Sequence, residues 1–317
     1  MIQVESIFSG GGGSTSEPLD PVEVYNTTRP SDWLPMPTPA DNEMYLLFHI
    51  PDGFSSLLAF TVTCTGNYTV ALGSVSDGAF VQMSSTTVAS GSKYETELFA
   101  DDYGNLTSDG HKQVMVKVSS TDILTWEPST HSKKTSPSDF AGWNIVEIAC
   151  RIPSGTSVAC GRNTVNKSLK KLRYFAWYGK NAVTNMSNMF YSCYSLTAIP
   201  QMDTSAVTNM SGMFSSCYSL TAIPQMDTSA VTNMRSIFSG CFSLTSITLD
   251  NTVTGWAGYD ISLINCSLSH ASIVAFFNSL PTITSAKAIT LKGNPGVSEL
   301  TNAEKAIATG KGWTLTL

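Results

Sequence analysis

The residues that could carry out chemistry are few and widely spaced. The four histidines lie in four separate segments: His49, His111, His131 and His270. None of them belongs to an H-E-x-x-H zinc motif, and neither a G-x-S-x-G nucleophile turn nor a G-x-x-x-x-G-K-[ST] phosphate loop occurs. Glu95 and Glu97 alternate along a strand-like segment and could pair as glycosidase acids. We expect no catalytic residue and no cofactor, with a glycan hydrolase as the alternative.

Two polar clusters could bind ions. Four residues, Asp101, Asp102, Asn105 and Asp109, surround a turn, and clustered oxygens suit Ca²⁺. Because the closing Glu of an EF-hand loop is absent, an ordinary polar turn is the alternative. A basic run follows further along the chain, at Lys167, Lys170, Lys171 and Arg173. It is either a solvated face or a patch for an anionic partner.

Cysteines recur at a fixed interval. Cys193, Cys217, Cys241 and Cys266 are separated by 24, 24 and 25 residues, and no pair has the close spacing of a zinc site. Seven cysteines cannot all pair within one chain. We therefore predict buried free thiols at a repeated core position, and no metal site.

The same interval separates two identical segments. The nineteen residues from Ser192 to Met210 occur again from Ser216 to Met234. Leu196–Ile199 is a short apolar run that predicts a strand, and it is followed by apolar residues at helical spacing: Val207, Met210, Met213, Phe214 and Cys217. A fixed period of this length predicts a solenoid of strand–helix units whose strands form a parallel ladder.

The pattern N-M-S-x-M-F-x-x-C-x-S-L-T-x-I followed by D-T-S-x-V-T-N-M resembles the BspA-like leucine-rich repeat family. The resemblance covers roughly residues 172–247. It implies a protein of a bacterial surface or of a prophage, with a role in adhesion.

Repeated positions outside the predicted core are the candidate binding residues. Tyr194, Tyr218 and Phe242 should stack as one column, and a second column follows at Thr197, Thr221 and Thr245. Aromatic side chains bring a large contact area at a low entropic cost, so the columns suit binding to a glycan or a protein. The alternative is that the aromatic rings only pack at the edge of the coil.

The predicted fold class is mixed: an all-β sandwich domain followed by an α/β leucine-rich-repeat solenoid with a C-terminal cap. Residues 1–40 form a Gly/Pro-rich arm or linker, and residues 41–165 form a β-sandwich with a weak resemblance to PKD-type Ig-like domains. The repeats occupy residues 166–250, and a cap of leucine-rich-repeat type occupies residues 251–317.

Composition limits the function further. Only 13% of the residues are charged and the net charge is −6, whereas Ser and Thr make up 79 of the 317 residues. This excludes a chain built to neutralise nucleic-acid phosphates. No membrane span and no recognisable signal peptide are found.

We expect a non-enzymatic binding or structural protein, most simply a virion-associated adhesin of a phage or prophage, located on the virion or the cell surface. Its arm would attach to the virion or surface scaffold, and its solenoid would contact a host glycan or protein. A bacterial cell-surface adhesin is the alternative, and a homo-oligomer is left open.

Overall fold

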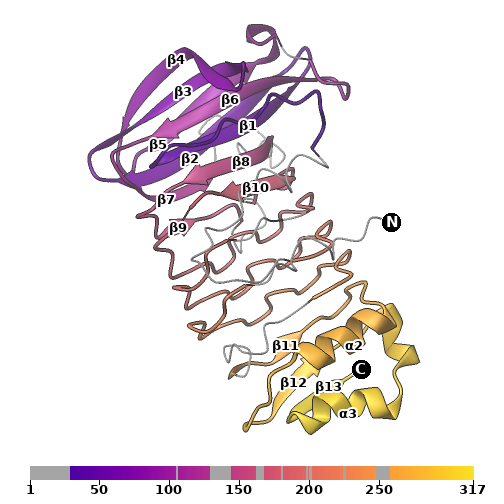
Figure 1. The fold of residues 1–317 in the computed structure, drawn as a ribbon. Helices are drawn as coiled ribbons and strands as arrows, with labels where there is room; N and C mark the ends of the chain where they lie inside the picture. Colours follow the sequence, from indigo (N-terminus) through magenta and orange to yellow (C-terminus); the bar gives the residue numbers. More distant parts are fainter. Residues whose placement is uncertain are drawn as a thin grey trace, which may run out of the picture.

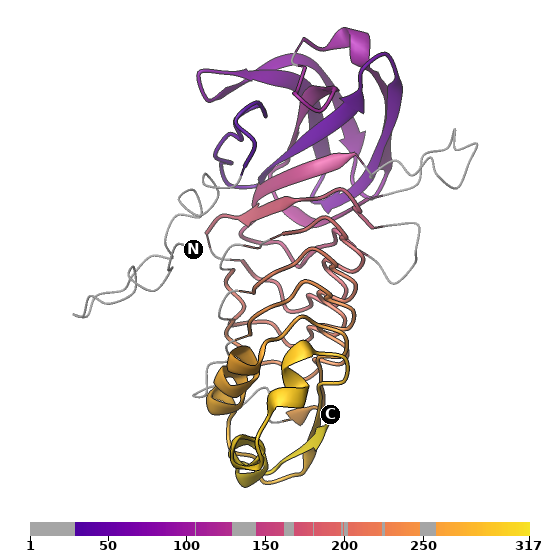
Figure 2. The ribbon, with the colours of Figure 1, turned by 90° about the vertical axis from the view of Figure 1, so that its right-hand side faces the viewer.

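The computed structural model describes residues 29–104, 106–128, 144–161, 168–179, 181–197, 199, 202–223, 226–247 and 258–317. The molecule is elongated (Figures 1 and 2). Two β-sheets occupy one end, two helices lie at the other end, and stacked coils of chain connect them.

The sheets are mainly antiparallel. The six-stranded sheet has the order β10 (Tyr174–Trp177), β8 (Ile145–Arg151), β1 (Glu43–Pro51), β6 (His111–Ser119), β3 (Asn67–Ser76) and β4 (Ala79–Ala89). The four-stranded sheet has the order β5 (Lys93–Phe99), β2 (Ser55–Cys64), β7 (Ile123–Pro128) and β9 (Ser157–Val158). A short 3-10 helix, η1 (Ala100–Asp102), follows β5.

Strand β1 is buried on both faces. Its side chains alternate, so Leu46 and Phe48 enter the core between the sheets while Tyr45 and Leu47 point to the other face. That other face is covered by a segment close to the start of the described chain, whose Trp33 is only 5% exposed. Residues 29–40 of the predicted arm thus pack on the sheet.

The stacked coils begin where the two sheets end. Strand β10 pairs parallel to β8 and strand β9 pairs parallel to β7, so the chain that enters the coils extends both sheets (Figure 1). The hydrophobic core runs without a break from the sheets through the coils to the C-terminal helices. We call residues 168–247 the coil stack.

Backbone hydrogen bonds between neighbouring turns hold the coil stack together. Met186 N–H donates to the Asn209 carbonyl at 2.8 Å, and one repeat later Met210 N–H donates to the Asn233 carbonyl at 2.8 Å. The bridges between coils are isolated, as from Asn185 to Asn209. After β10, the described residues between 181 and 247 form only such isolated parallel bridges and no strand of the predicted ladder.

The predicted α/β leucine-rich-repeat solenoid is therefore wrong, and with it the predicted fold class. The described chain is mostly β-sheet, with two α-helices that both lie outside the repeats. The physical reason is in the backbone: Gly212 and Ser216 have φ values of +62° and +61°, inside the segment predicted as a helix. A right-handed helix cannot pass through such residues. The N–H groups bond to the next coil instead.

The apolar residues whose spacing predicts that helix are nevertheless all buried. Phe190, Phe214 and Phe238 form an inner column with centroid separations of 5.7 and 5.9 Å. All seven cysteines are free and buried, which confirms the predicted thiols. Cys217 Sγ donates to the Phe190 carbonyl at 3.0 Å, and Cys241 Sγ repeats this contact with Phe214. The interval of 24 residues therefore corresponds to one core position that recurs in successive coils.

The C-terminal residues form a small parallel sheet, two α-helices and a 3-10 helix. A parallel three-stranded sheet has the order β11 (Ile261–Ser262), β12 (Lys287–Thr290) and β13 (Trp313–Thr316). The helices are α2 (His270–Ser279) and α3 (Asn302–Gly310), with the 3-10 helix η3 (Pro295–Glu299) between them. Ser269 caps α2, and Thr301 with Glu304 forms a capping box at the start of α3.

Candidate functional site: an aromatic column and a junction pocket

The outer aromatic residues stack as the repeat predicts. The rings of Tyr194 and Tyr218 lie 4.5 Å apart and nearly parallel, and those of Tyr218 and Phe242 lie 4.9 Å apart. Tyr218 is 38% exposed and Phe242 is 48% exposed. Because the rings cover one another's faces, the outer column presents ring edges and phenol hydroxyls to solvent.

The threonine column is tied to the backbone of the coils. Thr221 Oγ1 donates to the Thr197 carbonyl at 3.4 Å, and Thr245 Oγ1 donates to the Thr221 carbonyl at 3.1 Å. Thr197 makes the same bond to Arg173 at 3.3 Å. Each hydroxyl proton is therefore used within the coil stack, and the oxygen retains lone pairs that can accept a bond from a ligand.

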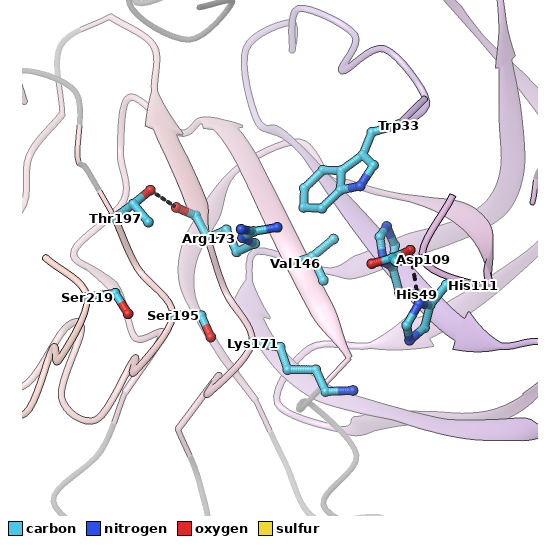
Figure 3. A pocket seen from close by; sticks show the side chains of 10 residues that line it. All are labelled: Trp33, His49, Asp109, His111, Val146, Lys171, Arg173, Ser195, Thr197 and Ser219. Atoms are coloured by element: carbon cyan, nitrogen blue, oxygen red, sulfur yellow. Dashed lines mark hydrogen bonds and ion pairs between the residues drawn. The ribbon is translucent and has the colours of Figure 1, made fainter. Parts of the chain in front are cut away.

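The second site was not predicted from the sequence. A pocket of about 350 Å³ lies at the junction between the sheets and the first coils (Figure 3). Figure 3 shows hydroxyls on one side, imidazoles and a carboxylate on the other, and two cations between them. The lining residues are Trp33, His49, Asp109, His111, Val146, Lys171, Arg173, Ser195, Thr197 and Ser219. The volume falls at the small end of ligand pockets, which span about 300–1,000 Å³.

An ion pair holds Trp33 in the pocket wall. Arg29 Nη2 lies 2.8 Å from Glu147 Oε2, with side-chain exposures of 11% and 0%. The same guanidinium donates to the carbonyls of Trp33 and Leu34. The buried Glu147 carboxylate in β8 therefore holds the segment from Arg29 to Leu34 against the sheet, because breaking a buried ion pair destabilises the fold.

The imidazole of His49 is oriented by Gln113. The Gln113 carbonyl oxygen accepts from Leu34 N–H at 2.7 Å, so its amide nitrogen faces His49 Nε2 at 2.9 Å and donates to it. The neutral ring then carries its proton on Nδ1. Burial lowers the pKa of His49 to about 4, and the neighbouring His111 lowers it as well.

Asp109 is the carboxylate of the pocket. It accepts from the Thr107 hydroxyl, and its Oδ1 lies 3.1 Å from His111 Nδ1. The hydrogen bond from Thr107 is the main reason that the pKa of Asp109 lies below its usual value, with His111 contributing further. The carboxylate is thus ionised and exposed, able to accept hydrogen bonds from a ligand.

The possible ligand atoms of His49, Asp109 and His111 lie within 4.8 Å of one another, as in a metal centre. The hydrogen bonds do not fit one. The Nε2 atom of His49 faces a donor and Nδ1 holds the proton, whereas a metal-bound histidine usually presents its second nitrogen to an acceptor.

The other predicted residues lie elsewhere. Asp101, Asp102 and Asp109 do not form a cluster that could hold a metal within the described residues. Glu95 pairs with Lys93 at 2.7 Å, and Glu97 accepts from the Ser55 hydroxyl at 2.7 Å.

The basic run divides between the two sites. Lys170 Nζ lies 5.4 Å from the Tyr194 ring centroid and so covers one end of the outer column, whereas Lys171 and Arg173 line the junction pocket. Lys167 and His131 lie outside the described residues.

Comparison with known proteins gives one match. Residues 163–261 match the family described as Mycoplasma protein of unknown function, DUF285. This similarity covers less than a third of the chain and coincides with the repeats and the segment that follows them. No curated protein and no solved structure matches.

The resemblance to BspA-like leucine-rich repeats is corrected by this finding. The model that matches is that of DUF285, and the described residues between 181 and 247 contain neither the strand nor the helix of a leucine-rich repeat unit. The PKD-type Ig-like assignment of the sheets gains no support from the solved structures. Within the described residues, no helix is both long and apolar enough to span a bilayer.

Proposed function

We propose that this protein is a non-enzymatic adhesin whose coil stack contacts a glycan or protein on a host or mucosal surface. The observation that supports it is the outer column of Tyr194, Tyr218 and Phe242, three aromatic rings in register on an exposed surface. Exposed aromatic groups that gather in one place are typical of binding sites.

The surroundings of the column favour contact at short range. Residues 181–250 carry only four charged side chains, Asp203, Asp227, Arg235 and Asp250. A partner would meet hydroxyls, amides and ring edges, so that shape and hydrogen bonds rather than charge steering would select it.

The elongated shape suits display from a larger particle (Figure 2). We propose a virion of a phage or prophage as that particle, with attachment through the N-terminal arm and the coil stack facing outward. A bacterial cell surface is the alternative. Mass spectrometry of density-purified virions separates them: the protein at a fixed copy number per particle supports the virion, and its recovery only with the cell envelope supports the alternative.

The binding proposal is tested with the purified chain on host cells and on immobilised mucin. The variant Tyr218→Ala/Phe242→Ala should lose most of the binding, while Tyr191→Ala, an aromatic change on the coil stack outside the column, should keep it. Equal binding by all three proteins would overturn the role of the column.

The non-enzymatic part has its own test. Incubation of the chain with the same mucin should release no new reducing ends. Release that a Glu95→Gln or Glu97→Gln change abolishes would replace the proposal with a glycan hydrolase.

A further inference from the structure

The junction pocket brings three charged side chains together, those of Asp109, Lys171 and Arg173. Arg173 lies with its guanidinium carbon 5.9 Å from the Trp33 ring centroid, and within the described residues no carboxylate lies at ion-pair distance from it. Lys171 donates to Asn144 Oδ1 at 2.8 Å, and desolvation lowers its pKa. Two cations thus line the pocket with no anion paired to them in the described chain.

The opposite sides of the pocket carry acceptors and hydroxyls. Asp109 presents an ionised carboxylate beside His111, and Ser195 and Ser219 line the side formed by the coils (Figure 3). Trp33 adds an apolar ring, held edge-on to His49 with a centroid distance of 4.8 Å. The complementary ligand carries one negative group, several hydroxyls and a small apolar surface.

A carboxylate fits the cations better than a more highly charged group. The guanidinium of Arg173 offers a planar fork that matches a planar carboxylate in two parallel hydrogen bonds. A dianion such as a phosphate monoester would meet the repulsion of Asp109 on the facing side. A neutral sugar would cover both cations without compensating their charge.

We infer that the junction pocket binds the carboxylate-bearing sugar of an acidic glycan. Arg173 and Lys171 bind the carboxylate of that sugar. Asp109 accepts hydrogen bonds from its hydroxyls, and Ser195 and Ser219 donate hydrogen bonds to them or accept hydrogen bonds from them. This inference rests on the proposed adhesive function and names its ligand class. Ser195 and Ser219 directly follow Tyr194 and Tyr218, so the remainder of the glycan would continue along the outer column.

The test uses the full chain and two matched oligosaccharides: one that ends in a glucuronic acid and the same one with that carboxyl group reduced to an alcohol. We expect the acid to bind at least tenfold more tightly, which corresponds to about 1.4 kcal/mol. Arg173→Gln should remove the preference, Arg173→Lys should keep part of it, and Arg235→Gln should leave it intact. Melting temperatures of the variants confirm that they fold.

The outcomes separate the pocket from the column. Equal binding of the acid and the alcohol by the wild type, or an unchanged preference in Arg173→Gln, overturns the pocket proposal; if Tyr218→Ala/Phe242→Ala still abolishes cell binding, the adhesive function stands. Equal affinity for a sulfated analogue overturns the carboxylate assignment. Absence of binding to the acid and the alcohol alike overturns the acidic-glycan assignment outright.

Discussion

The coil stack and the junction with the sheets are built on different principles. In the coil stack the contacts between neighbouring coils recur every 24 residues, as in the hydroxyl bonds of Thr221 and Thr245 and the thiol bonds of Cys217 and Cys241. At the junction each contact occurs once, as in the ion pair of Arg29 with Glu147. Repetition yields uniform, uncharged surfaces, whereas a pocket with several kinds of polar group forms where the repetition ends.

The coil stack also separates stability from recognition. The inner column of Phe190, Phe214 and Phe238 is fully buried, and the outer column of Tyr194, Tyr218 and Phe242 is partly exposed. Both columns stack at the same interval, yet only the inner one fills the core. The variants below test this division and the contrast with the junction, in order of decreasing expected effect.

Phe214→Ala should have the largest effect. The ring is 0% exposed and stacks on Phe190 and Phe238, so its removal leaves a cavity between two coils. We expect a loss of about 3–5 kcal/mol in the free energy of unfolding, measured by denaturant titration. A loss below about 1 kcal/mol would show that the inner column does not support the coil stack.

Arg29→Ala tests the unique contact at the junction. It removes the guanidinium from the buried Glu147 carboxylate, and breaking a buried ion pair typically costs 3–5 kcal/mol; because Arg29 is 11% exposed, water reaches the site, and we expect about 3 kcal/mol. Arg235→Ala, an exposed arginine of the coil stack, is the control and should stay within about 0.5 kcal/mol. An equal loss in the free energy of unfolding for the two variants would show that the ion pair does not stabilise the fold.

The buried thiols predict that the free energy of unfolding falls at high pH. Burial raises the pKa of Cys266 to about 12, and it raises the pKa of Cys193 and Cys217 well above the usual range. Above about pH 9 the unfolded chain releases these protons and the folded chain keeps them, so stability falls as pH rises. Each such thiol contributes about 1.4 kcal/mol per pH unit.

Cys217→Ala isolates this contribution. The variant should lose stability less steeply than the wild type between pH 9 and about pH 10, whatever its stability at neutral pH. Parallel profiles of the two proteins over this range, measured by denaturant titration at each pH, would contradict the assignment of a protonated, buried thiol.

Thr221→Val should have a smaller effect. The change keeps the shape and removes one hydrogen bond to the Thr197 carbonyl, which water can partly replace at this exposed position. We expect a loss of about 0.5–1 kcal/mol, read from the denaturation midpoint. A loss of more than about 2 kcal/mol would mean that the hydroxyl column, and not only the core, holds adjacent coils together.

The sequence reveals the periodic part of this molecule better than the rest. A shift of 24 residues places the buried thiols and the outer column correctly, because identical residues occupy equivalent positions in stacked coils. It also misleads: the spacing of Val207, Met210 and Phe214 fits a helical face, but the chain turns at Gly212 and Ser216, and the backbone bonds across coils. Inward-facing residues of a tight coil can share the spacing of a helix.

The strands of the two sheets lie within residues 41–165, which the sequence predicts as a β-sandwich, except for β10, which extends one sheet from further along the chain. The junction pocket could not be predicted in the same way. His49 and His111 are 62 residues apart, and Arg29 lies 118 residues from Glu147. The pairing of β1 with β6 brings the two histidines together, and the packing of the segment around Trp33 on the sheet brings Arg29 to Glu147. No local pattern in the sequence specifies either arrangement.

The most direct test of the account is Tyr218→Ala, with target binding and the melting temperature measured on the same sample. Tyr218 lies in the middle of the outer column and is partly exposed, so its removal should lower the melting temperature by about 3 °C or less. Binding to the host surface should weaken at least tenfold, by about 1.4 kcal/mol. Unchanged binding, or a loss of stability comparable to that of Phe214→Ala, would contradict the claim that the outer column serves recognition and the inner column serves the fold.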